Sequence, residues 1–120
     1  MQDILPKIRL SIDFIKEEIE KVDGSPEVKK EILNNCELLS NALSGCCNFD
    51  IDKEKAREIM GLALNEFDKT IKKIENDDKN KILFMLLITH IADIKFLLSS
   101  EEDQKRIMES MKEKGEEENN

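Results

Sequence analysis

The sequence contains no Trp and no Tyr, and only five Phe residues supply its aromatic character. Only two Pro and four Gly occur among its 120 residues, so residues that break helices are scarce. Strands are enriched in aromatic residues, whereas only 4% of this chain is aromatic and 38% of it is charged. These scarcities favour an all-α fold.

Cysteine and long hydrophobic runs are also scarce. The three cysteines, Cys36, Cys46 and Cys47, are an odd number without the repeated spacing of a disulfide framework, which favours a reduced, cytoplasmic protein. Charged residues interrupt Met1–Val22 throughout, so this segment does not resemble a secretory signal. The longest uncharged apolar run, 82–92, has 11 residues. A bilayer span needs about 20, so we expect no membrane partner.

Basic residues are too few to balance the acidic ones, since 19 Lys and Arg face 27 Asp and Glu, a net charge of −8. Nucleic-acid binders normally present a basic face, so we expect no direct contact with nucleic acid. Half of the excess lies in residues 99–120, where eight acids face four bases. We therefore predict one domain, 1–111, followed by an acidic, disordered tail, 112–120.

The first half of the chain predicts two helices. Apolar residues at spacings of three and four place one stripe along residues 4–22. Gly24 is predicted to close this helix in the left-handed conformation, and Ser25 to cap a second helix that ends near residue 44, before Gly45. The short turn between the two helices predicts antiparallel packing.

A third helix is predicted from about residue 52 to residue 75, capped by Asp50 or Asp52. Its small residues Gly61 and Ala63 suggest a place where another helix approaches closely. Glycine in a helix interior costs about 1 kcal/mol relative to alanine, so a packing reason for Gly61 is expected.

Residues 82–98 form the fourth predicted helix, with Asp77 or Asp78 as its cap, and a serine followed by acids starts a short fifth helix over 101–111. The predicted fold is an all-α antiparallel bundle of four long helices plus a short C-terminal fifth helix. The fourth helix has two apolar sides. One side carries Phe84, Leu87, Ile88, Ile91 and Leu98, and the other carries Ile82, Leu86, Phe96 and Leu97.

A bundle normally hides only one side of each helix, so the second side of 82–98 must be covered in some other way. Burying one Leu, Ile or Phe is worth about 1.5–3 kcal/mol. Four left in water would cost a large part of a domain's typical stability of about 5–15 kcal/mol. We expect this helix either at the centre of the fold or at the interface with a second copy or another protein.

Thr89, His90 and Asp93 are the polar residues of this helix that lie close enough in sequence to meet on one face. A carboxylate beside an imidazole would orient it and favour its charged form. The three residues form either a hydrogen-bonded structural cluster or a binding site. No nucleophile is fixed beside them by sequence, so we assign no catalytic residue and expect no enzyme.

Metal ligands do not follow the usual spacings. Zinc sites commonly use pairs such as Cys-x-x-Cys, whereas Cys46 and Cys47 are adjacent and only Cys36 and His90 could complete a set. Residues 50–61 lack the glycine and glutamate of a calcium loop. We predict no metal and no cofactor. Whether Cys46 and Cys47 are redox-active is left open.

A helical domain of about 120 residues with one helix-borne histidine, His90, resembles a histidine phosphotransfer domain in size and class. The resemblance implies phosphoryl transfer on His90. Those domains carry a lysine and a glycine shortly after the histidine, but here Lys95 is displaced and no glycine follows. Asp93 would also repel a phosphoryl group.

The preferred interpretation is a non-enzymatic, acidic helical protein that acts by binding another protein or itself, as a homodimer, in the role of an adaptor, regulator or complex subunit. The alternative is an acidic inhibitor, of the kind viruses use, that blocks a nucleic-acid-binding protein. A further alternative is phosphotransfer or another enzymatic activity at His90. No small-molecule substrate is expected.

Overall fold

The computed structural model describes residues 3–49 and 51–118, with side chains through Lys112. Within these ranges the chain forms helices and no strand. The elements are α1 (Leu5–Lys21), α2 (Pro26–Asn48), α3 (Lys53–Ile74), a 3₁₀ turn η1 (Asp78–Asn80), α4 (Lys81–Leu98) and α5 (Glu101–Glu118). The predicted all-α fold is confirmed. In the described part of the chain, no helix combines the length and hydropathy that a bilayer span requires.

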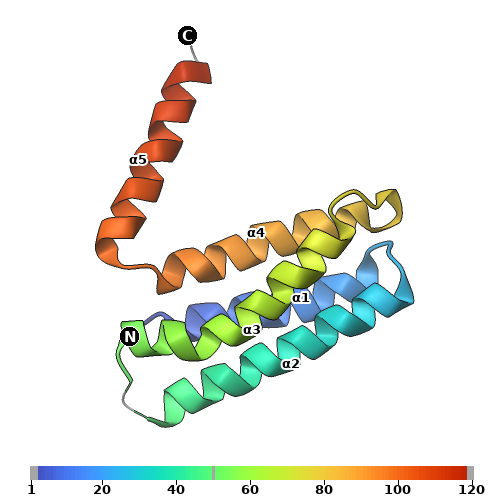
Figure 1. The fold of residues 1–120 in the computed structure, drawn as a ribbon, viewed down its shortest axis with the longest axis horizontal. Helices are drawn as coiled ribbons and strands as arrows, with labels where there is room; N and C mark the ends of the chain where they lie inside the picture. Colours follow the sequence, from blue (N-terminus) through green and yellow to red (C-terminus); the bar gives the residue numbers. More distant parts are fainter. Residues whose placement is uncertain (1–2, 50, 119–120) are drawn as a thin grey trace.

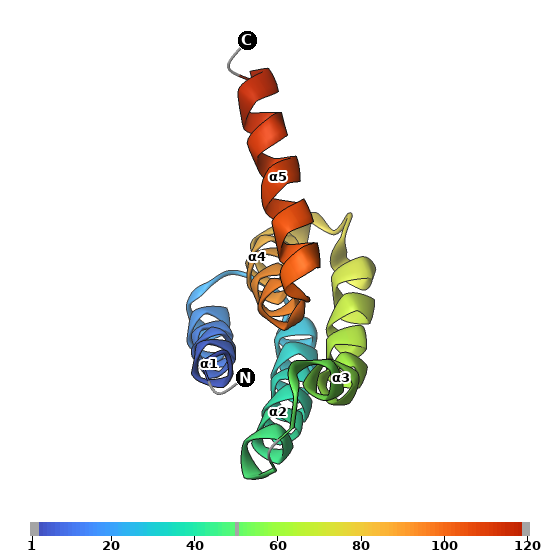
Figure 2. The ribbon, with the colours of Figure 1, turned by 90° about the vertical axis from the view of Figure 1, so that its left-hand side faces the viewer.

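Helices α1 to α4 form an antiparallel four-helix bundle. Seen end-on they occupy the corners of a square, and the main packing pairs run around it: α1 with α2, α2 with α3, α3 with α4, and α4 with α1 (Figure 2). Helix α5 rises away from the bundle at the end of α4 (Figure 1). Helix α4 is therefore one corner of the bundle, and its predicted central placement is wrong.

The core is built from one apolar stripe of each helix, as the 3.6-residue period requires. Helix α1 contributes the predicted Ile8, Ile12, Ile15 and Ile19, each at most 1% exposed. Helix α4 contributes Leu87, Ile91 and Leu98 as predicted, together with Leu83 and Ile94. Phe67 of α3 is the one Phe of the described residues that is fully buried, so Ile and Leu dominate the interior.

One buried polar group joins α2 to α3. The side-chain amide Nδ2 of Asn35 donates to Thr70 Oγ1 at 2.8 Å and to the Glu66 carbonyl at 3.4 Å. Asn35 is 5% exposed, so these bonds replace water that the amide cannot reach. The pairing fixes the register of the two helices, because sliding one past the other would leave the amide unpaired.

The turn between α1 and α2 corrects the prediction for Gly24. No glycine of the described residues has a positive φ, so the predicted left-handed conformation is wrong. A Cβ at Gly24 would instead collide with the Leu83 side chain and lie 3.3 Å from Asn80 Oδ1. Ser25 occupies the predicted cap position, but its side chain makes no cap bond, and its amide donates to Asn80 Oδ1 at 2.8 Å.

Two other glycines behave differently from their predictions. Helix α2 does not end before Gly45 but continues to Asn48, and Cys46 is 3% exposed against the core. Burial of Cys46 offsets the cost of about 1 kcal/mol for a helical glycine. A Cβ at Gly61 would meet no atom within 4 Å, so the expected close helix approach at this residue is wrong.

The predicted N-terminal caps of the later helices are confirmed only in part. Asp52 caps α3 as predicted, with Oδ1 accepting from the Lys55 amide at 2.8 Å, whereas Asp50 lies outside the described residues. Asp77 caps η1 rather than α4, because the chain makes a 3₁₀ turn before α4 begins. The α5 helix is not short. It continues to Glu118, because Glu, Lys, Arg and Met favour helix and the segment contains no proline.

Candidate functional site

The three predicted site residues, all on α4, do not form a hydrogen-bonded cluster. Thr89 Oγ1 donates to the Met85 carbonyl of its own helix at 2.9 Å. The His90 ring packs on Phe14 of α1, with ring centroids 4.7 Å apart. Asp93 is exposed. Because the helix turns by about 100° per residue, His90 faces α1, whereas Thr89 and Asp93 face away from the bundle.

The outer face of α4, which we define by the exposed residues Ile82, Met85, Ile88, Thr89, Ala92 and Asp93, carries a row of apolar side chains, and the exposed Lys81 and Lys95 border it. Ile82 is 48% exposed, Met85 55% and Ile88 42%, and Phe96 at the far end is half-buried. Of the second apolar side that the sequence predicted, only Ile82 belongs to this face, whereas Ile88 was predicted on the first side, and Leu86 and Leu97 pack against the core. Neighbouring helices of the bundle do not cover them, because α1 and α3 pack on the flanks of α4.

Helix α5 carries its own exposed apolar stripe, formed by Ile107, Met108 and Met111. Together with Ala92 and Phe96 of α4, this α5 stripe lines a groove of about 470 Å³, which we name the α4–α5 groove. Asp93, Lys95 and Ser99 form its polar edge. Ile107, Met108 and Met111 lie on the predicted fifth helix, but their position beside α4 was not predicted, because the direction of α5 is not encoded in either hydrophobic pattern.

Hydrogen bonds hold the base of α5 in place. Gln104 Nε2 donates to the Phe96 carbonyl at 2.8 Å, which satisfies an end carbonyl of α4. Ser100 Oγ accepts from the Asp103 amide at 3.1 Å and so caps α5. Arg57 of α3 donates from Nε to the Leu98 carbonyl at 2.8 Å. The joint between α4 and α5 therefore has a defined geometry, from which the rest of α5 projects (Figure 1).

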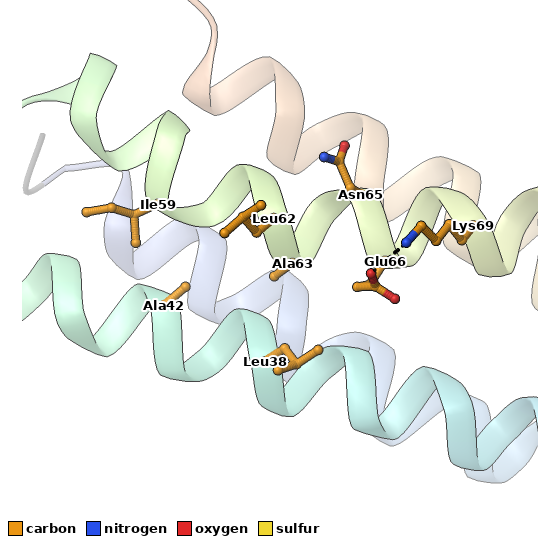
Figure 3. A pocket seen from close by; sticks show the side chains of 8 residues that line it. All are labelled: Leu38, Ala42, Ile59, Leu62, Ala63, Asn65, Glu66 and Lys69. Atoms are coloured by element: carbon orange, nitrogen blue, oxygen red, sulfur yellow. Dashed lines mark hydrogen bonds and ion pairs between the residues drawn. The ribbon is translucent and has the colours of Figure 1, made fainter.

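A second groove lies between α2 and α3, with a volume of about 650 Å³. Figure 3 shows its lining residues on the two helices, among them the exposed Leu38 and Leu62. Glu66 and Lys69 pair at 3.0 Å along its α3 wall. This groove was not predicted, because Leu38 and Leu62 lie outside the predicted core stripes. It is larger than the α4–α5 groove.

The cysteines differ in their environment. Burial raises the pKa of the Cys36 thiol from 9.0 to about 12, and burial also raises the pKa of Cys46. Cys47 is exposed, so of the two cysteines considered for reactivity only Cys47 is accessible. Within the described part of the chain, no three His, Cys, Asp or Glu residues come together in a way that could hold a metal ion.

No family model, curated protein or solved structure matches this chain. The function is therefore inferred from the geometry and chemistry of the surfaces described above.

Proposed function

We propose that this chain is a non-enzymatic, cytoplasmic protein that acts through protein–protein interaction, as an adaptor, regulator or complex subunit, and that the outer face of α4 is its contact surface. The observation that carries the proposal is the row of half-exposed apolar residues Ile82, Met85 and Ile88. Monomeric proteins rarely leave a large contiguous apolar patch uncovered, and such patches commonly bind another protein.

The size of the apolar surface supports this proposal. The exposed fractions of Ile82, Met85 and Ile88, added to those of the α5 stripe, amount to about three fully exposed side chains. At about 1.5–3 kcal/mol each, covering them contributes roughly 5–9 kcal/mol. Association costs about 4–15 kcal/mol in lost freedom, so this surface alone gives modest affinity and needs further contacts at its polar edge.

The alternatives use this surface less well. An acidic inhibitor of a nucleic-acid-binding protein would contact its target through carboxylates, and phosphotransfer would use the His90 imidazole. Neither alternative accounts for an apolar row on α4. Protein binding uses the apolar row and leaves Thr89 and Asp93 as polar contacts on the same face, so we place it first.

Site-specific photo-crosslinking tests the proposal in cells that produce the protein. A photoreactive residue replaces Met85 on the outer face of α4, and the matched control carries it at Asn41, an exposed position of α2. We expect protein adducts, including adducts to a second copy, at Met85 and far fewer at Asn41. Equal yields at the two positions, or no adduct at Met85, would refute this function.

A further inference from the structure

We infer that α5 is a hinged lid, which closes over the C-terminal half of the outer face of α4 in its own chain and competes with a partner for this surface. The inference rests on the proposed function, because it names the regulation of the same surface. The closed lid covers Ile88, Ala92 and Phe96 and leaves Ile82 and Met85 accessible.

The structure shows the lid open, with its apolar side already turned towards α4 (Figure 1). The α5 stripe lines one wall of the α4–α5 groove, and Ala92 and Phe96 line the other. The groove has a volume of about 470 Å³, and both walls come from one chain. Narrowing the angle between the two helices therefore brings two exposed apolar surfaces together and removes them from water.

Little holds α5 away from α4 in the described part of the chain. The main packing pairs lie among α1 to α4 and η1, and α5 belongs to none of them. Among the described side chains, one hydrogen bond joins α5 to the bundle, from Gln104 Nε2 to the Phe96 carbonyl. It connects the first turn of α5 to the last turn of α4, which also adjoin in the closed lid, so closure can retain it.

The hinge is the connection Ser99–Ser100, in which Ser99 is extended, with φ −71° and ψ 152°. Helices joined by two to five residues commonly pack antiparallel as a hairpin. The α1–α2 connection, residues 22–25, already pairs its helices in this way. Closure of the lid gives α4 and α5 the same arrangement through a change of backbone dihedral angles at the two serines.

The length of the connection sets the register of the closed helices. The last residue of α4 and the first residue of α5 lie at the same level on its two sides. Counting away from this pair places Ile107 over Ala92 and Met111 over Ile88. The small side chain of Ala92 leaves room for Ile107. The α5 stripe therefore ends at Ile88 and does not reach Met85.

Charges beside the two apolar surfaces pair in this register. At about 100° per residue, Asp93 and Lys105 lie on one flank of the closed helices, and Lys95 and Asp103 lie on the other. Each pair brings opposite charges to the same level, which is favourable. Lys95 is already paired with Asp68 of α3 at 2.7 Å, so the pair of Asp93 and Lys105 contributes more to closure.

Distances between two spin labels measure closure in the purified full-length chain. The labels are attached to Lys81→Cys at the start of α4 and to Glu109→Cys on the outer side of α5, with Cys47→Ser to remove the exposed native thiol. In the closed lid the Cα atoms of the two sites lie about 15–20 Å apart. We expect this short distance beside the longer distance of the open structure.

Two results of this measurement would overturn the lid. One is a single long distance, which means that α5 stays open. The other is a short distance that disappears when labelled chains are diluted with unlabelled ones, because such a distance arises between two chains.

Two alanine substitutions test whether the α5 stripe drives closure. Ile107→Ala removes an apolar contact of the closed lid and should lower the ratio of closed to open chains about three- to tenfold. Arg106→Ala, on the side of α5 that faces away from α4, is the matched control and should not lower the ratio. Circular dichroism checks that both variants keep the helical fold. Equal losses in the two variants would mean that the apolar stripe does not close the lid.

Charge reversal tests the register. Asp93→Lys should lower the ratio of closed to open chains, and adding Lys105→Asp should restore much of it, since the pair is then attractive again. If Lys105→Asp restores nothing, the closed register is wrong and the lid as proposed is overturned.

Locking the lid tests its effect on the contact surface. Ala92→Cys and Ile107→Cys in one chain, again with Cys47→Ser, place two thiols over each other in the closed lid, and oxidised glutathione joins them. A partner on the outer face of α4 needs Ile88 and Ala92 as well as Met85. The photoreactive residue at position 85 should therefore give fewer adducts in the locked chain, and reduction should restore the yield. An unchanged yield in the locked chain overturns the competition.

The outcomes separate this inference from the proposed function. Adducts at position 85 without any short label distance overturn the lid and keep the proposed function. A short label distance without any adducts supports closure and refutes the proposed function, and the regulatory role of the lid is then refuted with it.

Discussion

Replacing Gly24 by alanine probes the tightest backbone contact in the bundle. The Cβ of alanine would collide with the Leu83 side chain, coming within 2.8 Å of its Cγ and 3.3 Å of Asn80 Oδ1. Leu83 is 0% exposed and packed on all sides, so it cannot move without disturbing the core. Asn80 accepts the hydrogen bond from the Ser25 amide and is also constrained.

The expected magnitude follows from two opposing terms. Overpacking of a core typically costs about 1–3 kcal/mol. The loss of backbone freedom in the unfolded chain stabilises an alanine variant by about 0.4–1 kcal/mol, because the backbone at Gly24 has no positive φ that alanine would avoid. Gly24→Ala should therefore lower the free energy of unfolding by roughly 1–2 kcal/mol.

Gly61→Ala is the matched control, because it adds the same methyl group where no atom lies within 4 Å. Gly61 lies inside α3, so alanine should raise the free energy of unfolding by about 0.5–1 kcal/mol. Urea denaturation, followed by the circular dichroism signal of the helices, measures the free energy of unfolding of both variants. The two substitutions should change stability in opposite directions.

The result that would refute this reasoning is a Gly24→Ala variant as stable as the native chain. A double-mutant cycle with Leu83→Ala identifies the cause. Leu83→Ala alone should cost about 2–5 kcal/mol, but it also removes the atoms that the new methyl group meets. Gly24→Ala should then cost less in the Leu83→Ala background than alone. Simple additivity would mean that Leu83 does not set the constraint.

Two further predictions concern buried groups. Asn35→Ala should lower the free energy of unfolding by about 1–3 kcal/mol, because Thr70 loses its buried partner, whereas Asn34→Ala, at an exposed position, should change it by less than about 0.5 kcal/mol; urea denaturation of both variants checks this. Because burial raises the pKa of Cys36 from 9.0 to about 12, its contribution to stability is complete below pH 9 and is lost as the pH rises from 9 towards 12, by at most about 1.4 kcal/mol per pH unit. Denaturation midpoints across this range should fall less steeply for Cys36→Ala than for the native chain, and an equal slope would contradict the effect of burial.

Hydrophobic periodicity predicted the bundle well because the buried face of each helix can be identified from residues that are close together in the sequence. Spacings of three and four identified the buried face of α1 without any knowledge of its neighbours. The same information failed at Gly45, where the local preference to end a helix is weaker than the burial of Cys46 one residue later. Gly24 was assigned to the correct turn for the wrong reason, since its contact with Leu83 is 59 residues away in sequence.

The candidate surface was predictable only in part. The excess of apolar residues on 82–98 indicated that a second face needed cover. Of the residues predicted for that face only Ile82 is exposed, because Leu86 and Leu97 pack against the core, whereas Ile88 was assigned to the other side and Met85 to neither. The sequence could not show that α1 and α3 would occupy the flanks and leave this face outward. Nor could it give the direction of α5, because the hydrogen bonds at the joint, from Gln104 to the Phe96 carbonyl and from Arg57 to the Leu98 carbonyl, join residues that no local pattern relates.

The hydrogen bond from the Ser25 amide to Asn80 Oδ1 has a consequence for how the bundle opens. It ties the α1–α2 turn to the η1 turn, and Asn80 is anchored in turn by Nδ2 donating to Asp77 Oδ2 at 2.8 Å. The Asn80 side chain thus joins the α1–α2 hairpin to the α3–α4 hairpin at this end of the bundle. The two hairpins cannot separate at that end until the hydrogen bond from the Ser25 amide to Asn80 breaks. Partial opening of the bundle should therefore begin at the opposite end, where the α2–α3 connection and the start of α5 lie (Figure 1).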